Sequence, residues 1–136
     1  MKYLHGGYIL FCDHAEHAEN GRVNADGLFD LFVGKIPFNM DCDMVVGFGT
    51  PFERRQYKGL VVIENPDSHE VFRKEFLAND PSDIFKGHYI VHSDVLFDRE
   101  GLWTVKAVLR NYKEETMWDC QRQFWTMIEG EAPPDP

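Results

Sequence analysis

Three side chains near the start of the chain have the types and the spacing of metal ligands. Cys12, His14 and His17 form a C-x-H-x-x-H run. If this segment curls into a turn, both imidazoles can reach one ion, and the Cys12 thiolate is a soft third ligand. The structural alternative makes Cys12 a buried strand residue and places both histidines on an exposed acidic loop. We favour this alternative, because zinc sites usually recruit a fourth ligand or an open water position and no further ligand is evident.

A second pair of histidines lies in a segment where apolar and polar residues alternate. His88 and His92 are four residues apart, so in a strand they share one face with Asp94. Alternate residues on one face can bind a metal ion or form a patch that titrates near neutral pH. We favour an ordinary solvent-exposed strand face, because half-buried strands normally show this alternation.

Acidic pairs near predicted strand ends raise the question of calcium binding. The pairs are Asp26 and Asp30, Asp41 and Asp43, and Asp94 and Asp98. Aspartates at the tip of a β-sandwich can bind Ca²⁺, but the sequence has no D-x-D-x-D-G run. Turn capping explains the pairs without a ligand. We therefore expect no cofactor, and zinc and calcium are the alternatives.

The composition is that of a folded domain and argues against two classes of partner. The chain has 136 residues, of which 43% are apolar and 27% are charged, and its net charge is −9. A surface this acidic repels nucleic-acid phosphates and anionic lipids. We therefore expect the protein to bind neither nucleic acid nor membranes. Three scattered cysteines fit a reducing compartment, and the short apolar run that ends at Asp13 is no signal sequence. We expect a cytoplasmic protein.

Apolar residues alternate with period two along most of the chain, which predicts β-strands. The predicted strands cover residues 8–12, 28–33, 44–48, 57–64, 71–76, 88–97, 103–110 and 116–128. Residues 82–85 can form at most one short helical turn. Seven or eight short strands predict an all-β fold, and we expect a two-sheet antiparallel β-sandwich of immunoglobulin-like, Greek-key type. Residues 1–128 form the single predicted domain, and the acidic, proline-rich tail 129–136 is predicted to be disordered.

Two stretches of this pattern also match a known family loosely. The first reads Leu10-Phe11-Cys12-Asp13-His14-Ala15, then Glu19-Asn20-Gly21-Arg22, then Gly27-Leu28-Phe29-Asp30; the second runs from Val95-Leu96-Phe97 through Asp98-Arg99-Glu100-Gly101 to Trp103, Val105 and Ala107. Over about residues 7–128 the chain resembles an uncharacterised bacterial family of small β-sandwich domains of unknown function. Glu100 and Trp103 depart from the family pattern, where Pro and Tyr are common. The resemblance implies the fold and no activity.

The last predicted strand offers a candidate interaction face. By strand parity, Met117, Trp125 and Met127 share the face opposite to Trp118 and Phe124. This face either contacts a protein partner or a second copy of the chain, or is buried within the monomer, and the sequence leaves both open.

No Gly-rich oxyanion loop or positioned third group accompanies Cys12 and its histidines, so we predict no catalytic residue. We expect a non-enzymatic binding or assembly module, which associates with a protein partner or forms a homodimer. The alternative is a small metal-binding domain or metal-dependent enzyme that uses the His and Cys residues of the first connector.

Overall fold

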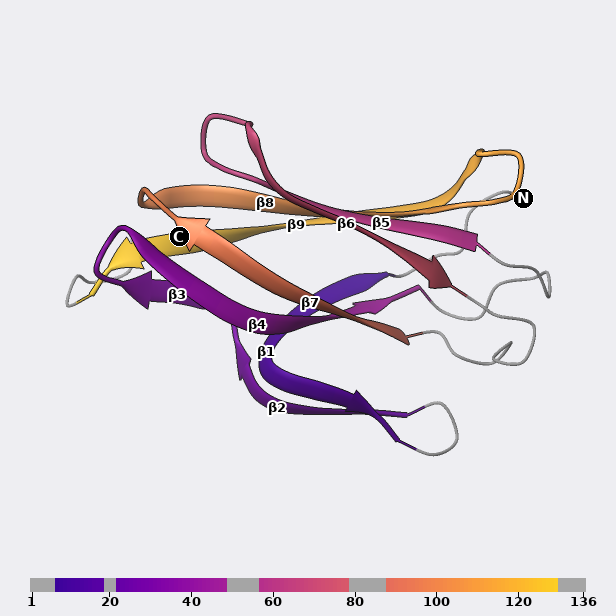
Figure 1. Ribbon diagram of the computed structural model, residues 1–136, viewed down its shortest axis with the longest axis horizontal. Helices are drawn as coiled ribbons and strands as arrows, with labels where there is room; N and C mark the ends of the chain where they lie inside the picture. The colour runs from indigo at the N-terminus through magenta and orange to yellow at the C-terminus, as the bar shows by residue number, and fades with distance from the viewer. Residues whose placement is uncertain (1–6, 19–21, 49–56, 79–87, 130–136) are drawn as a thin grey trace.

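Within residues 7–18, 22–48, 57–78 and 88–129, which the structure describes, the chain forms nine β-strands and no helix. In the computed structural model (Figure 1) the strands are β1 (Tyr8–His17), β2 (Val23–Phe29), β3 (Leu31–Gly34), β4 (Phe38–Gly47), β5 (Tyr57–Glu64), β6 (Glu70–Ala78), β7 (His88–Phe97), β8 (Gly101–Arg110) and β9 (Thr116–Ile128). Accordingly, these ranges contain no helix able to cross a membrane. The predicted helical turn at 82–85, and the predicted tail beyond Glu129, lie outside the described residues.

The strands belong to two sheets. Sheet A has the strand order β2-β1-β4-β7, and sheet B has the order β3-β9-β8-β5-β6. The hairpins β1–β2, β5–β6 and β8–β9 each stay within one sheet, whereas the other connections change sheets. The prediction of an all-β chain arranged in two sheets is confirmed.

Four details of the sequence prediction are wrong. The first strand was predicted over residues 8–12 but continues to His17, so His14 and His17 lie in a strand and not in an exposed loop. Residues 28–33 form not one strand but the end of β2 and the start of β3, which Asp30 separates and which belong to different sheets. The count is therefore nine rather than seven or eight. Since β3 runs parallel to β9, the pairing is also not antiparallel throughout. Finally, β4 begins at Phe38 rather than Met44. The sequence prediction missed the first part of the strand because Asn39, Asp41 and Asp43 have low strand propensity.

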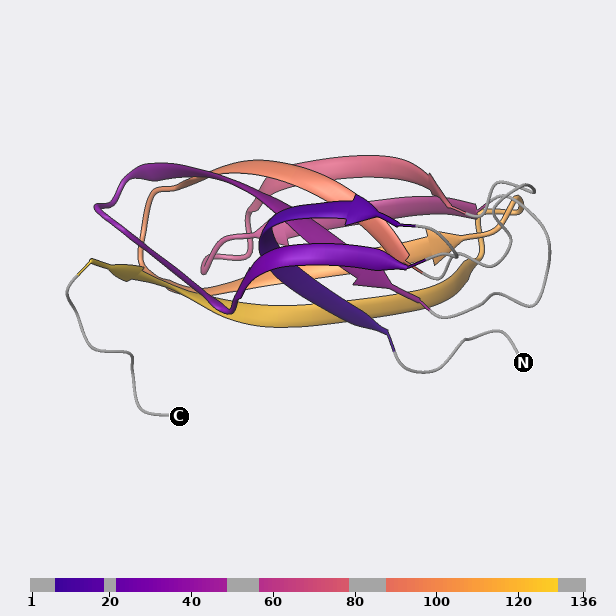
Figure 2. The same cartoon turned by 90° about the horizontal axis from the view of Figure 1, so that it is seen from below.

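One hydrophobic core lies between the sheets, and sheet B is curled around it as a half-barrel (Figure 2). The alternation seen in the sequence explains the core, since residues at every second position of β7 and β8 are buried. Phe32 of the short strand β3 has ring centres at 5.1 Å from Phe11, 4.7 Å from Phe97 and 4.9 Å from Phe124. These contacts join rings from both sheets, so a four-residue strand contributes a central part of the core.

Arg122 of β9 occupies a core-facing position and joins sheet B to sheet A. Its Nη1 donates to the carbonyl oxygen of Ile9 at 2.9 Å, and its Nη2 forms an ion pair with Asp30. The guanidinium also lies 5.2 Å from the ring centre of Phe11. Because β2 pairs with β1 only from Phe11 onward, the Ile9 carbonyl lies beyond that pairing, and the arginine supplies its donor. The residue that interrupts the apolar pattern of β9 thus closes one side of the core.

This bridge predicts that Arg122→Lys destabilises the fold although the charge is kept. A lysine ammonium cannot reproduce the planar fork that reaches Ile9 and Asp30 together, so we expect the free energy of unfolding to fall by about 1–2 kcal/mol. Urea denaturation measures this change. Arg110→Lys, at an exposed position of the neighbouring strand β8, is the matched control and should change stability by less than about 0.5 kcal/mol. Equal effects of the two substitutions would contradict the bridging role.

Candidate functional site

A sharp bend in β1 positions the candidate site (Figure 1). The pairing of β1 with β4 ends at Cys12 and Asp43, whereas its pairing with β2 continues to His17. Opposite the bend, Gly27 has a φ of 71°, and a Cβ there would lie 2.2 Å from Oδ2 of Asp13. This backbone conformation favours glycine, and a side chain here would also displace the Asp13 carboxylate. The bend carries the β1–β2 hairpin away from β4 and over the outer face of sheet A.

A small second apolar cluster holds the hairpin against that face. It contains Cys12, Ala15 and Val45, all buried, with Leu10, Val23, Ala25 and Ile90 packed around them. Val45 and Ile90 come from the outward face of the β4–β7 pair, whereas Val23 and Ala25 come from the hairpin. Sheet A is therefore covered on part of its outer face by its own first two strands.

Asp43 is the polar centre of this region, and it is only 7% exposed. Its Oδ2 accepts the Ala15 N–H at 2.8 Å, and its Oδ1 lies 2.9 Å from Nδ1 of His92. His14 approaches from the other side, with Nδ1 at 3.5 Å from Oδ2. Burial alone would raise the pKa of the Asp43 carboxyl, but the hydrogen bonds from His92 and Ala15 and the charge of the imidazoles outweigh it and lower that pKa. Asp43 is therefore an ionised hydrogen-bond acceptor at neutral pH.

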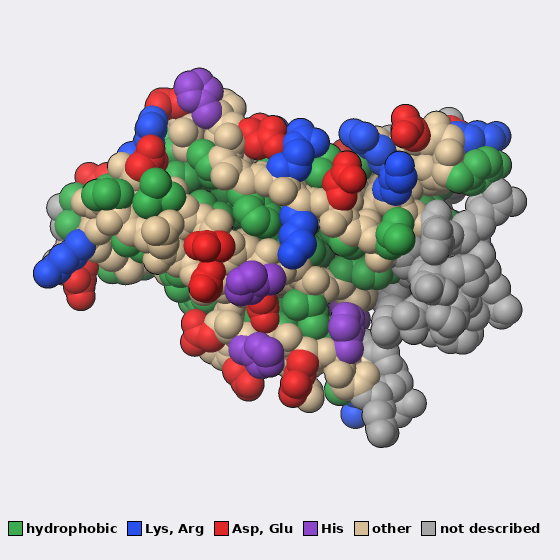
Figure 3. Space-filling model, in the orientation of Figure 1, with side chains coloured by type: hydrophobic (Ala, Val, Ile, Leu, Met, Phe, Trp, Pro, Cys, Tyr) green, Lys and Arg blue, Asp and Glu red, His purple; other side chains and the backbone are tan. Residues whose placement is uncertain are grey.

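The contacts of Asp43 continue into a row of alternating carboxylates and imidazoles across three strands. His92 Nε2 lies 3.6 Å from Oδ1 of Asp41, and His14 Nε2 lies 4.0 Å from Oε2 of Glu16. We call Glu16, His14, Asp43, His92 and Asp41 the Asp43 cluster. In Figure 3, imidazoles and carboxylates gather over the lower part of the molecule, where sheet A lies, and Lys and Arg side chains gather mostly above.

The predicted Cys12, His14 and His17 set is not brought together by a turn. The segment is part of strand β1 and not a turn, and within it Cys12 is buried whereas His14 and His17 are exposed. Cys12 is fully buried, its Sγ donates weakly to the Asp43 carbonyl at 3.5 Å, and burial followed by the Asp43 charge raises the pKa of its thiol. A neutral, buried thiol is a poor ligand and a poor nucleophile.

His88 and His92 do share the outer face of β7, but they make different contacts. Ile90 lies between them on that face, and His88 Nδ1 is hydrogen-bonded to the Tyr8 hydroxyl. Across the ranges that the structure describes, no group of three or more His, Cys, Asp and Glu side chains is arranged to hold a metal ion as it stands. The zinc and calcium alternatives therefore stay predictions.

The aspartate pairs are distributed differently from the prediction. Asp41 and Asp43 lie within β4, and Asp26 lies within β2, rather than in loops at a strand end. Asp30 is bound to Arg122, and Asp98 to Arg99. These aspartates therefore lie within strands or form ion pairs, whereas turn capping was the role expected from the sequence.

The predicted interaction face is only partly exposed. Trp125 is 42% exposed, but Met127 is 6% exposed and Met117 is half-buried against the core. Strand pairing instead places Leu31 of β3 and Leu102 of β8 on either side of Trp125. We call Leu31, Trp125, Leu102 and the exposed Val33 the Trp125 row. Sequence reasoning missed three of its members, because they become neighbours only through the pairing of β3, β9 and β8.

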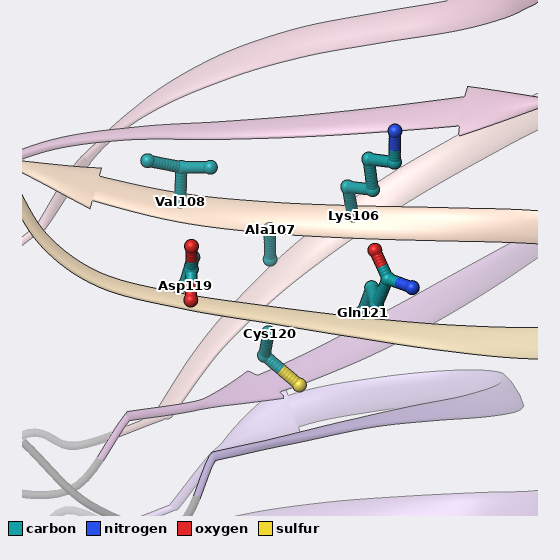
Figure 4. Close-up of a pocket in the computed structure, with 6 residues that line it drawn as sticks. All are labelled: Lys106, Ala107, Val108, Asp119, Cys120 and Gln121. Atoms are coloured by element: carbon teal, nitrogen blue, oxygen red, sulfur yellow. The ribbon is translucent and has the colours of Figure 1, made fainter.

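A shallow hollow of about 280 Å³ lies between β8 and β9 (Figure 4). Lys106 and Val108 line it from β8, and Asp119 and Gln121 from β9. The Lys106 ammonium is already paired with Glu64 at 3.1 Å, and burial raises the pKa of the Cys120 thiol. Because the hollow is smaller than ordinary ligand pockets and offers no activated group, we do not assign it a substrate.

Comparison with protein-family models and with curated proteins finds no match to this chain. The resemblance to the bacterial β-sandwich family therefore stays a prediction.

The Asp43 geometry predicts a pH-dependent effect of Asp43→Asn. The pKa of Asp43 is lower in the folded chain than its unfolded value of about 3.9, so the ionised form stabilises the fold. That contribution is complete above the unfolded pKa and is lost as the pH falls through the folded pKa. We expect Asp43→Asn to lower the free energy of unfolding by about 1–3 kcal/mol at pH 7, since a buried charged acceptor is removed.

Urea denaturation at pH 7 and at about pH 3 tests this expectation, and the difference between wild type and variant should shrink at the lower pH. Asp119→Asn, which removes the same charge from an exposed position of β9, is the control and should have little effect at either pH. A pH-independent difference between Asp43→Asn and wild type would contradict the electrostatic account.

Proposed function

We propose that this protein is a non-enzymatic assembly module that associates with a second copy of itself through the Trp125 row. The observation that supports this proposal is the apolar row across three strands, in which Trp125 and Val33 are exposed and Leu31 and Leu102 are half-buried. Outward positions of half-covered strands are normally polar, and a contiguous apolar surface with a central Trp is typical of a protein contact. A self-complementary contact around a two-fold axis would pair each Trp125 with the row of the other copy.

The distribution of charge favours a contact between two copies through sheet B over a contact through sheet A. The outer face of sheet B carries Lys58, Lys106 and Arg110 together with Glu64 and Asp119, so its charges nearly balance. The four strands of sheet A contain no Lys or Arg at all. In a chain of net charge −9, two copies therefore repel each other least through sheet B.

The chemistry of the described side chains supports a non-enzymatic role. The thiols of Cys12, Cys42 and Cys120 all have raised pKa values because of burial. Ser93, which follows His92, points into the core and bonds to Cys42. The His92–Asp43 pair thus has no nucleophile at hydrogen-bonding distance among the described residues.

For the fold we retain the finer proposal of an immunoglobulin-like, Greek-key β-sandwich. Supporting it are the two sheets around one core, the connections that alternate between them, and the parallel pairing of β3 at the edge of sheet B. The metal-dependent alternative in its original form, with Cys12, His14 and His17, is less well supported, because β1 is extended there.

The assembly proposal predicts that wild type is a dimer and that Trp125→Glu converts it to a monomer. A charge in the middle of an apolar contact should raise the dissociation constant at least about 30-fold, as expected for a central Trp. Light scattering coupled to size-exclusion chromatography measures the molar mass. Leu77→Glu is the matched control, since Leu77 is a 68% exposed apolar residue of β6 outside the row, and this variant should remain a dimer.

Two results would overturn the proposal. A wild type that is monomeric at millimolar concentration excludes self-association. A dimer that persists in Trp125→Glu places the contact elsewhere.

A further inference from the structure

The far half of the β1–β2 hairpin is joined to sheet A by side-chain contacts and not by strand pairing. In sheet A, β2 is an edge strand, and within the described residues it pairs with no strand except β1. The pairing of β1 with β4 stops at Cys12 and Asp43, whereas its pairing with β2 continues to His17. In Figure 1 the ends of these two strands project below β4 and β7. We call residues 13–17 and 23–26 the hairpin arm, whose two strands pair with each other and not with β4.

The base of the arm contains a residue that suits a hinge. The strand pairs on either side of the bend are Cys12 with Leu28 and His14 with Asp26. Between them lies Gly27, whose φ of 71° is in the left-handed region that glycine adopts without strain. Hinges are a few positions that absorb a change in φ and ψ, and they are often small residues. The arm can therefore rotate at this bend while the pairing within the hairpin stays intact.

The contacts that hold the arm against sheet A are concentrated around Asp43. The Ala15 N–H donates to Oδ2 of this carboxylate at 2.8 Å, and His14 Nδ1 lies 3.5 Å from the same oxygen. Ala15 also belongs to the second apolar cluster, whose buried members are Cys12, Ala15 and Val45, none larger than valine. Because hydrophobic stabilisation scales with the apolar area buried, these small side chains stabilise the closed arm far less than the main core stabilises the fold.

Movement of the arm would uncover a defined set of apolar groups. Val45 of β4 and Ile90 of β7 lie on the outer face of sheet A in the second cluster, and Cys12 at the base of the arm is 0% exposed. The main core contains no residue of the arm, so it stays packed when the arm moves. Proteins open locally in cooperative units at a lower free energy than global unfolding, and such units have few buried apolar contacts. The hairpin arm has these properties.

We propose that the hairpin arm opens as a unit about Gly27, and that the hydrogen bond from Ala15 to the Asp43 carboxylate is the latch that keeps it closed. The closed arm covers the Cys12 thiol and an apolar strip of sheet A, and the open arm exposes both. The outer face of sheet A thus has a covered and an uncovered state, which interconvert without unfolding of the main core. This motion does not depend on self-association, since the Trp125 row lies on sheet B.

Thiol labelling of the full-length wild-type chain with methyl methanethiosulfonate, a small uncharged reagent, tests this motion. Cys12 and Cys42 are both buried, but Cys12 lies in the second cluster and Cys42 in the main core, so they report different openings. Each rate is divided by that of the same thiol in the unfolded chain, and peptide mass spectrometry distinguishes the two sites. We expect Cys12 to be labelled at least about 10-fold faster than Cys42. Low urea concentrations should accelerate Cys42 steeply and Cys12 little, because global unfolding exposes far more surface.

Asp43→Asn tests the latch itself. Loss of the buried charged acceptor should raise the relative labelling rate of Cys12 at least about 10-fold, and Cys12 should still be labelled ahead of Cys42. Asp94→Asn is the matched control, because it removes the same charge from an exposed position on the same outer face, and it should leave the rate of Cys12 unchanged.

The wild-type comparison needs no substitution, so it decides the matter even if Asp43→Asn does not fold. A relative rate of Cys12 in wild type that does not exceed that of Cys42 would overturn the proposal, as would an equally steep urea dependence of the two thiols. An unchanged rate of Cys12 in folded Asp43→Asn would also overturn it.

Discussion

Where β1 leaves β4, a hydrogen bond to the Asp43 carboxylate replaces the main-chain hydrogen bonds between the two strands. Strand pairing ends at Cys12 and Asp43, and the next link between the two strands is the hydrogen bond from the Ala15 N–H to the Asp43 side chain. This bond allows β1 to bend without leaving a buried donor unpaired. The curled hairpin, the second apolar cluster and the orientation of His92 all depend on it. Asp43 thus has a structural role first, and any chemistry of its neighbours follows from that role.

The two outer faces of the molecule differ in the kind of contact that they can make. The strands of sheet A carry imidazoles and carboxylates but no Lys or Arg, whereas sheet B carries the Trp125 row among charges that nearly balance. The proposed contact between two copies therefore uses the second face, where like charges repel less.

Most of what sequence reasoning predicted correctly is local. Period two is visible within a single strand, so the strands, the inward side of Trp103 and Trp118, and the shared face of His88 and His92 could all be predicted. The Asp43–His92 contact could not, because it requires the register of β4 against β7. The same holds for the neighbours of Trp125. The polar start of β4 was missed because aspartate and asparagine have low strand propensity. The contacts of Arg122 with Ile9 and Asp30 could not be predicted, because they join segments far apart in the sequence.

The single residue between β2 and β3 sets a strict limit on chain length. Asp30 is the single residue between Phe29 in sheet A and Leu31 in sheet B, so this crossing from one sheet to the other cannot absorb a change in chain length. One residue more or fewer would shift the register of β3 against β9 by one position, which would turn Phe32 outward and turn Leu31 and Val33 inward. The core would lose the ring of Phe32, and the Trp125 row would lose Leu31 and Val33 at the same time. Among homologous chains, this crossing should therefore tolerate substitution far better than insertion or deletion.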